Sequence, residues 1–252
     1  MRSCCVRPRR FLKVAVAGLV PLFIFLTIGP VRAENLANER VTELLERGIA
    51  KWRSVSYMET TLIRRERLVG QDEIGQPQVI ECRFRSEPRS VYMRWLDGPG
   101  KSRELAWVQG RNNNMFKVTP GGLLAGVIVD RRIDDAEVFK VSRHTVMDAG
   151  IGQLLEKVHD QFEAAGSDAM VFYKGVELVD GRECDLFYRF LPQKQGYYCW
   201  KLELYIDREL GLPVRATCYD WLKQPFEDYV YTDVELNVPQ TAEEFAIGKS
   251  SD

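Results

Sequence analysis

The sequence predicts an α+β fold: a strongly curved antiparallel sheet, open like half a barrel, with two main helices packed on its concave side. Three observations lead to this prediction. Short runs of alternating hydrophobicity, separated by turn residues, cover most of the chain. Only two segments show the spacing of an amphipathic helix. A long sheet with so few helices must curve around them to bury its apolar face.

The first predicted helix precedes the first strand. Gly48 lies on its apolar side, where the missing side chain permits close packing against the sheet. Charged residues such as Glu43 and Lys51 occupy the positions between the apolar ones. The apolar residues recur at helical spacing: Val41, Leu44, Leu45, Ile49 and Trp52.

Strands of the first half follow in close succession. Within one of them, the alternation of a strand places Val91, Met93 and Trp95 on one face. Tyr92, Arg94 and Leu96 then lie on the other face. The turn Asp97-Gly98-Pro99-Gly100 then separates two strands. The expected strands are residues 57–68, 79–84, 91–96, 104–109 and 115–118.

The second half begins with an excursion at residues 119–147, in which we expect at most one short strand. A second helix follows, for which Asp148 is the expected N-cap. Its apolar stripe consists of Ile151, Leu154, Leu155, Val158 and Phe162. The remaining strands are expected at residues 170–178, 184–190, 197–206, 213–220 and 227–236.

Residues 1–33 are typical of a signal peptide. Basic residues from Arg2 to Lys13 precede an uncharged run, and Val31-Arg32-Ala33 supplies a cleavage site. The alternative is an uncleaved membrane anchor, although the run is short for a full span and Pro21 interrupts it. We therefore expect an exported protein of the periplasm or cell envelope, with residues 34–252 as a single β-rich domain.

The charge distribution limits the partners. Residues 1–33 hold six of the 35 Lys and Arg residues and none of the 36 Asp and Glu residues, so residues 34–252 are acidic overall. Nucleic acids and anionic membrane surfaces both attract positive potential. We expect no nucleic-acid partner, and membrane contact only transiently or through an uncleaved N-terminal segment.

Two sets of short motifs, one in each half of the chain, are similar to those of a known protein family. One set is residues 204–207 (LYID), 211–213 (GLP), 231–237 (YTDVELN) and Phe245. The other is residues 83–85 (RFR), Pro88, 90–95 (SVYMRW), 98–100 (GPG) and 103–105 (REL). Through them the chain resembles the outer-membrane lipoprotein carrier (LolA-like) superfamily, specifically an uncharacterised envelope group within or near it. The resemblance implies an open half-barrel whose apolar concave face receives lipid chains or lipoproteins.

Sets of residues for catalysis or for metal binding are not recognisable in the sequence. The only histidines are isolated: His144 is expected in a polar loop, and His159 on the partly exposed surface of the second helix. The carboxylates of Asp134 and Asp135 are expected in a solvated loop. No cofactor is therefore predicted, and an enzyme such as a hydrolase is the least favoured class.

Four cysteines follow the export segment, and none forms a C-x-x-C pair. An oxidising compartment favours disulfides. Cys199 with Cys218 is the first expected pair, and four buried free thiols are the alternative.

Aromatic and basic side chains in the strands provide the candidate ligand site. Arg83, Arg85, Arg89 and Arg94 form either a positive strip for an anionic head group or a solvated surface. The candidate ligand-binding residues are Phe84, Tyr92, Arg94, Trp95, Trp107, Tyr188, Trp200, Leu202 and Leu204.

The preferred function is a non-catalytic one: binding or carrying an apolar ligand, either a lipid, an acyl chain or a lipoprotein. The alternative is a protein–protein interaction module in envelope assembly or sensing, with a filled concave face. An accessible apolar cavity would favour the carrier, and an exposed apolar patch or open sheet edge would favour the module.

Overall fold

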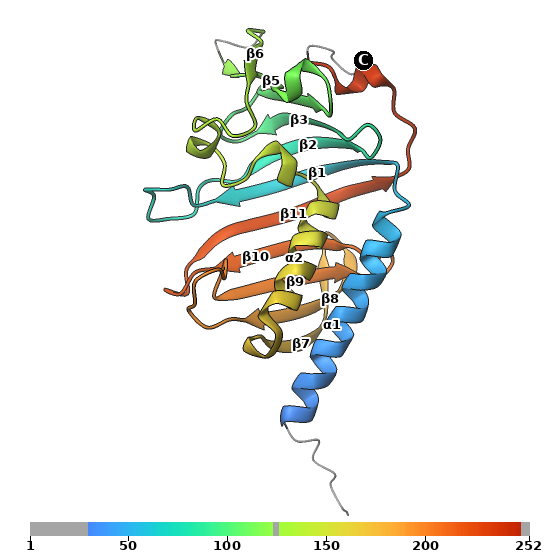
Figure 1. Ribbon diagram of the computed structural model, residues 1–252, viewed down its shortest axis with the longest axis vertical. Coiled ribbons are helices and arrows are strands. Elements are labelled where there is room, and N and C mark those ends of the chain that lie inside the picture. The colour runs from blue at the N-terminus through green and yellow to red at the C-terminus, as the bar shows by residue number, and fades with distance from the viewer. Residues whose placement is uncertain (1–29, 123–125, 248–252) are drawn as a thin grey trace, which may run out of the picture.

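The computed structural model describes residues 30–122 and 126–247, with side chains from residue 36 onward, and one antiparallel sheet of eleven strands dominates it (Figure 1). The strand order is β6-β5-β4-β3-β2-β1-β11-β10-β9-β8-β7. The first and last strands of the chain are therefore neighbours at the centre of the sheet, and each half of the chain builds one side of it.

The elements follow the predicted order. The helices are α1 (Pro30–Trp52) and α2 (Ile151–Ala165). The first six strands are β1 (Tyr57–Glu66), β2 (Gln78–Arg85), β3 (Ser90–Asp97), β4 (Glu104–Val108), β5 (Phe116–Thr119) and β6 (Val129–Arg131). The last five are β7 (Met170–Val179), β8 (Arg182–Phe190), β9 (Lys201–Asp207), β10 (Pro213–Tyr219) and β11 (Pro225–Leu236).

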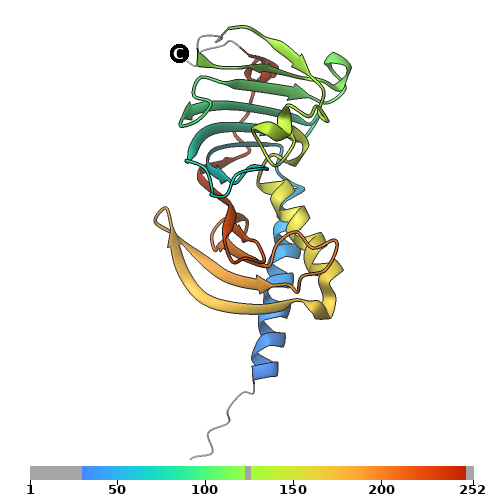
Figure 2. The ribbon, with the colours of Figure 1, turned by 90° about the vertical axis from the view of Figure 1, so that its left-hand side faces the viewer.

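Both helices lie on the same face of the sheet, over the half that contains β7 to β10 (Figures 1 and 2). Close contact requires glycine at two points. A Cβ on Gly48 would lie 3.0 Å from the carbonyl oxygen of Gly211 and 3.3 Å from Leu155. A Cβ on Gly152 would lie only 1.9 Å from the ring of Trp52. The predicted α+β fold, an open curved sheet with two helices on one face, is confirmed.

The start of the chain differs from expectation in one respect. α1 begins at Pro30, eleven residues before the first residue of the predicted apolar stripe. The expected cleavage point after Ala33 therefore falls in its first turn, while residues 1–29 of the expected signal peptide lie outside the described residues. Among the residues that are described, no helix is both long and apolar enough to cross a membrane.

Asp148 was predicted as the N-cap of α2, and this prediction is wrong. Gly150 occupies that position, with φ of 100°, a conformation that glycine adopts easily. Asp148 instead ends the short 3₁₀ turn η4 (Val146–Asp148), where its carboxylate accepts the backbone N–H of Thr145 in a capping box. The cap signal was correctly recognised, but it belongs to the preceding turn.

The motif that links β9 to β10 has a clear physical basis. The carboxylate of Asp207 accepts the backbone N–H groups of Glu209 and Leu210 at 2.8 and 2.7 Å, and it also pairs with Arg182. Gly211 completes the turn with φ of 63°. One buried carboxylate thus satisfies the donors that a tight turn leaves without partners.

The C-terminal end covers part of the other face of the sheet. The 3₁₀ turn η6 (Ala242–Phe245) places Phe245 against Tyr92 and Ala106 in a small separate core. The guanidinium of Arg85 lies 4.8 Å from the centre of the Phe245 ring. The contact with Phe245 explains why Tyr92 is buried although it points away from the main core.

Candidate functional site: an apolar pocket in the uncovered half of the sheet

A pocket of about 360 Å³ lies between the concave face of β1 to β5 and the segment of residues 131–150. This volume falls in the range of about 300–1,000 Å³ that is typical of small-molecule sites. Val141 lines the pocket and is 42% exposed, so the pocket reaches the surface. The sheet contributes mostly apolar side chains to the pocket, among them Met58, Leu62, Phe84, Val91, Met93, Trp95, Leu105, Phe116 and Val118.

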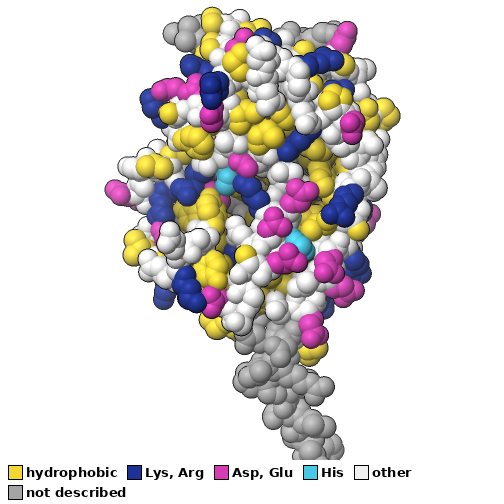
Figure 3. Space-filling model, viewed as in Figure 1, with side chains coloured by type: hydrophobic (Ala, Val, Ile, Leu, Met, Phe, Trp, Pro, Cys, Tyr) yellow, Lys and Arg dark blue, Asp and Glu magenta, His cyan; other side chains and the backbone are white. Residues whose placement is uncertain are grey.

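The pocket exists because the two helices cover only one half of the sheet. Every second residue of β1 to β5 points toward the concave face, as in any strand. Figure 3, which looks onto the helix-bearing face, shows hydrophobic side chains gathered over this half. The space that a third helix would fill is instead covered by residues 131–150, whose own apolar contributions to the pocket are Val138, Val141, Val146 and Ala149.

This covering segment is attached to the sheet mainly through a buried carboxylate. Glu227 of β11, only 3% exposed, accepts hydrogen bonds from Arg143 Nε at 2.9 Å and from the Tyr198 hydroxyl. His144 Nε2 lies 2.9 Å from the same carboxylate oxygen. Burial, followed by the charge of Glu227, raises the pKa of Tyr198 far above its usual value, so its hydroxyl remains a donor.

A second carboxylate adds to this attachment. Glu66 of β1 lies directly opposite Glu227 in the β1–β11 pairing. It accepts the Tyr229 hydroxyl at 2.5 Å and the backbone N–H of Arg143 at 3.2 Å. Arg64, two residues earlier, donates from Nη1 to the Ser142 hydroxyl at 3.0 Å. These polar contacts hold the covering segment at residues 142–144, and Arg89 adds a hydrogen bond to the carbonyl of Met147 at 2.6 Å.

Two arginines lie against the ring of Trp95 at the same pocket. The Cζ atoms of Arg64 and Arg103 are 5.8 and 5.3 Å from the centre of the Trp95 ring. Arg64 also donates from Nε and Nη2 to the Gln78 side chain. The guanidinium of Arg103, in contrast, has no hydrogen-bond or ion-pair partner among the described residues. Burial, and then the positive charge of Arg64, lowers the pKa of Arg103.

The nine predicted ligand-binding residues do not form one site. Phe84 and Trp95 line the pocket. Trp107, Leu202 and Leu204 are fully buried in the main core. The other four lie elsewhere: Tyr92 under Phe245, Arg94 paired with Glu81, Tyr188 in the smaller core around Val179, and Trp200 edge-to-face with Phe190.

The four arginines considered as a positive strip have separate partners. Arg83 and Arg94 both pair with Glu81, at 2.7 and 2.6 Å. Arg85 donates to the Ser90 hydroxyl, and Arg89 donates to the carbonyl of Met147 at 2.6 Å. All four guanidinium groups thus have contacts within the fold. Arg103, which also lines the pocket, has no such partner among the described residues, and its local sequence marks it only as part of the motif at residues 103–105.

The four cysteines of residues 34–252 are free and buried. Burial raises the pKa of Cys82 to about 12. Cys199 is different, because a hydrogen bond from the Cys218 thiol, assisted by the charge of Arg189, lowers its pKa. Arg189 Nη2 lies 3.6 Å from the Cys199 sulfur. The expected pair is thus adjacent as thiols, and its oxidation in the envelope stays a prediction.

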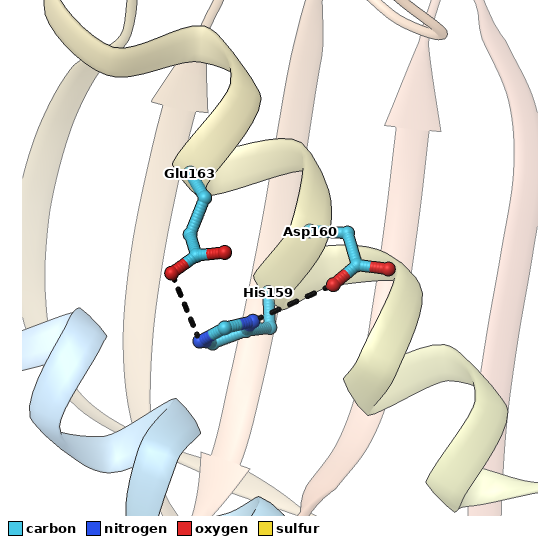
Figure 4. A group of neighbouring side chains, drawn as sticks. All are labelled: His159, Asp160 and Glu163. Carbon is cyan, nitrogen blue, oxygen red and sulfur yellow. Dashed lines mark ion pairs between the residues drawn. The ribbon is translucent and has the colours of Figure 1, made fainter.

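His159 forms a small charged group on α2 with Asp160 and Glu163 (Figure 4). Its Nδ1 lies 3.6 Å from Asp160 and its Nε2 lies 3.9 Å from Glu163, so the two carboxylates flank opposite nitrogens of the ring. One ligand atom from each of the three residues lies within 4.8 Å of the other two. Both carboxylates are largely exposed, which is typical of surface ion pairs.

Comparisons with known proteins support the fold. A model of the family described as "Protein of unknown function (DUF1571)" matches residues 55–250. Among curated proteins, no sequence matches this chain significantly.

Solved structures give more distant matches. The crystal structure of MucB has a TM-score of 0.52 and 18% identity over 83% of this chain and 63% of that chain. The Pseudomonas aeruginosa MucA/MucB complex gives 0.50 and 17%, covering 83% and 61%. A LolA superfamily protein from Nitrosomonas europaea gives 0.33 and 9%, covering 79% and 94%. This chain therefore spans less than two thirds of MucB, and the likeness concerns the fold alone.

Proposed function

We propose that this chain, which belongs to the DUF1571 family of proteins of unknown function, binds an apolar ligand in the pocket between β1 to β5 and residues 131–150. The observation that carries the proposal is the pocket itself. It has about 360 Å³, and most of the side chains that the sheet contributes to it are aliphatic, aromatic or sulfur-containing. Such surface gains about 25 cal/mol for each Å² that a ligand removes from water.

The way in which the pocket is covered supports reversible binding. Residues 131–150 begin at the last residue of β6 and contain two short 3₁₀ turns, Val138–Lys140 and Val146–Asp148, but no long helix. Their polar attachment is concentrated at Arg143 and His144, near the end of β1 and the start of β11. Segments with few buried apolar contacts open at lower cost than the core of a sheet. A ligand could therefore enter and leave without unfolding the half-barrel.

A carrier role follows if the predicted export segment delivers the chain to the envelope. Lipids and acylated proteins are the apolar molecules that must cross that aqueous space. The pocket needs no catalytic group for this task, and we propose a non-catalytic role.

The test is native mass spectrometry of protein purified without detergent, followed by solvent extraction. We expect a discrete adduct that extracts as a lipid or acyl chain. The matched variant is Val118→Trp, because Val118 lines the pocket from a partly exposed position and a larger side chain there fills the space. The proposal fails if the wild-type protein is free of adduct and binds neither lipids nor an apolar dye, or if Val118→Trp retains the same adduct.

The second candidate is a protein–protein interaction module. It is favoured by β7, an edge strand of the described sheet that exposes a row of apolar side chains. Met170, Phe172, Val176 and Leu178 are between 43% and 69% exposed. Edge strands of this kind are templates for pairing with another chain. MucB, which shares the fold, has been solved in complex with MucA.

The two candidates differ in which substitution matters. Phe172→Lys and Leu178→Lys place charges on the β7 edge and leave the pocket unchanged. If they abolish recovery of a protein partner from envelope extracts while Val118→Trp has no effect, the interaction module is the better description.

A further inference from the structure

The pocket contains one cation that has no partner within the described part of the chain. Arg103, which immediately precedes β4, lines the pocket, and its guanidinium has no hydrogen-bond or ion-pair partner among the described residues. It packs instead against the ring of Trp95 and against Gly100. Arginine is seldom removed from water without an anionic partner, because the guanidinium carries five donors.

The other charged side chains at the pocket are already neutralised within the fold. Arg131 pairs with Asp135 at 3.3 Å, and Glu137 with Lys140 at 2.6 Å. Asp148 pairs with Lys157 at 2.7 Å. In the same way Arg83 pairs with Glu81, while His144 and Glu66 belong to the attachment of the covering segment described above.

Arg64 increases the positive character of the place where Arg103 lies. Both guanidinium groups contact Trp95, and the carboxylate nearest to Arg64 is that of Glu66, at 3.8 Å from Nη1. That carboxylate is occupied by the Tyr229 hydroxyl and the Arg143 backbone. Two like charges beside one apolar ring repel each other, and an anion between them removes the repulsion.

We propose that Arg103, assisted by Arg64, binds the anionic head group of an amphiphilic ligand whose hydrocarbon chain occupies the apolar pocket. This inference rests on the proposed function. The head group is a carboxylate or a phosphate, because the planar guanidinium fork matches both with paired hydrogen bonds. The chain then runs from Trp95 along Met93, Leu105 and Phe116, which line the same wall.

This arrangement distinguishes an acidic amphiphile from a neutral or cationic one. A neutral chain of equal length fills the pocket but leaves the Arg103 donors unpaired. A cationic amphiphile places a third positive charge beside Arg64 and Arg103. The structure therefore favours fatty acids or phosphate-bearing lipids over alcohols, esters and amines of the same chain length.

The experiment compares three ligands that share one chain: dodecanoate, dodecyl phosphate and dodecanol. Their affinities are measured by isothermal titration calorimetry on the wild-type protein and on Arg103→Gln, Arg103→Lys and Arg131→Gln. Arg131→Gln is the matched control, because it removes a charge from the same pocket that Asp135 already neutralises. Dodecanol binding also shows that each variant keeps its fold and its pocket.

We expect at least one anionic ligand to bind the wild-type protein about 10- to 100-fold more tightly than dodecanol, as a charged hydrogen-bonded pair provides. Arg103→Gln should abolish this preference without changing dodecanol affinity, Arg103→Lys should retain part of it, and Arg131→Gln should keep most of it. The anion that binds more tightly then identifies the head group as carboxylate or phosphate.

Two results would overturn the inference while leaving the proposed function intact. One is equal affinity of the three ligands for the wild-type protein. The other is an equal loss of anion preference in Arg103→Gln and Arg131→Gln, which would indicate a general effect of charge. If none of the three ligands binds the wild-type protein, the proposed function itself fails.

Discussion

Replacement of Gly152 by alanine should destabilise the protein, although the same change usually stabilises a helix. Gly152 lies in the first turn of α2 and is fully buried. Its backbone is helical, so an alanine there would gain about 1 kcal/mol from helix propensity alone. The added Cβ, however, would lie 1.9 Å from Cε2 and Nε1 of Trp52.

The steric cost outweighs the gain in propensity. Carbon atoms in contact are separated by about 3.5–4.0 Å, so the Trp52 ring must move by more than 1 Å. The ring has little room, because it is 8% exposed and stacks on Phe84 with ring centroids 5.1 Å apart. Overpacking of this kind costs about 1–3 kcal/mol, and expulsion of the ring from the core costs about 3–5 kcal/mol. The expected net loss is about 1–3 kcal/mol.

Urea denaturation followed by circular dichroism measures the change. Asp160→Ala is the control on the same helix, because Asp160 is exposed and alanine is the better helix former, so this variant should be slightly more stable. In a Trp52→Ala background the clash disappears, and Gly152→Ala should become neutral or stabilising. The reasoning is refuted if Gly152→Ala matches or exceeds wild-type stability when Trp52 is present.

Three further predictions concern buried polar groups. Asp207→Asn should cost about 1–3 kcal/mol at neutral pH, because turn donors lose a charged acceptor. Burial opposes its ionisation, but hydrogen bonds from Arg182 and the turn amides hold the pKa of Asp207 below its usual value. The contribution of the Asp207 carboxylate to stability is therefore complete above about pH 4 and is lost as the pH falls. The free energies of unfolding of wild type and variant should converge in acid, and a difference that stays constant with pH would contradict this. Glu227→Gln should loosen residues 131–150, so the increase in hydrogen-exchange rate over the wild-type protein should be larger there than in β9. An equal increase in both places would argue against the attachment. Cys199 should be alkylated before Cys82 in the reduced protein and should cross-link to Cys218 on mild oxidation, as peptide mapping would show, and first reaction of Cys82 would be contrary to its pKa of about 12.

The order and number of elements were accessible from the sequence because alternation and turn chemistry are local. Each strand predicted from a period of two residues is present, and β6 is the short strand expected within the excursion at residues 119–147. The face assignment in β3 was also correct, since Val91, Met93 and Trp95 all line the pocket. Local sequence did not identify the role of Asp148, because the turn η4 and the helix α2 follow each other directly and the capping residue could belong to either.

The site was much less accessible, because its residues meet only through the sheet. His144 was expected in a polar loop without a partner of its own, because its partner Glu227 lies 83 positions later in the chain. Arg103 was quoted only as part of a family motif, because nothing local distinguishes an unpaired arginine from one that has a carboxylate nearby. Aromatic residues on the two faces of one strand, such as Tyr92 and Trp95, look equally suited to a pocket until the covering element is known.

The central position of the β1–β11 pair has a consequence for how the chain acquires its structure. Met58 pairs with Leu236, so the middle of the sheet joins residues from opposite ends of the chain. The outer strands pair mostly with their neighbours in sequence and can form as hairpins. The β1–β11 pair cannot form until β11 is available, and such non-local pairing slows folding. A chain that is synthesised from its N-terminus therefore leaves β1 without its central partner until the last strand has emerged from the ribosome.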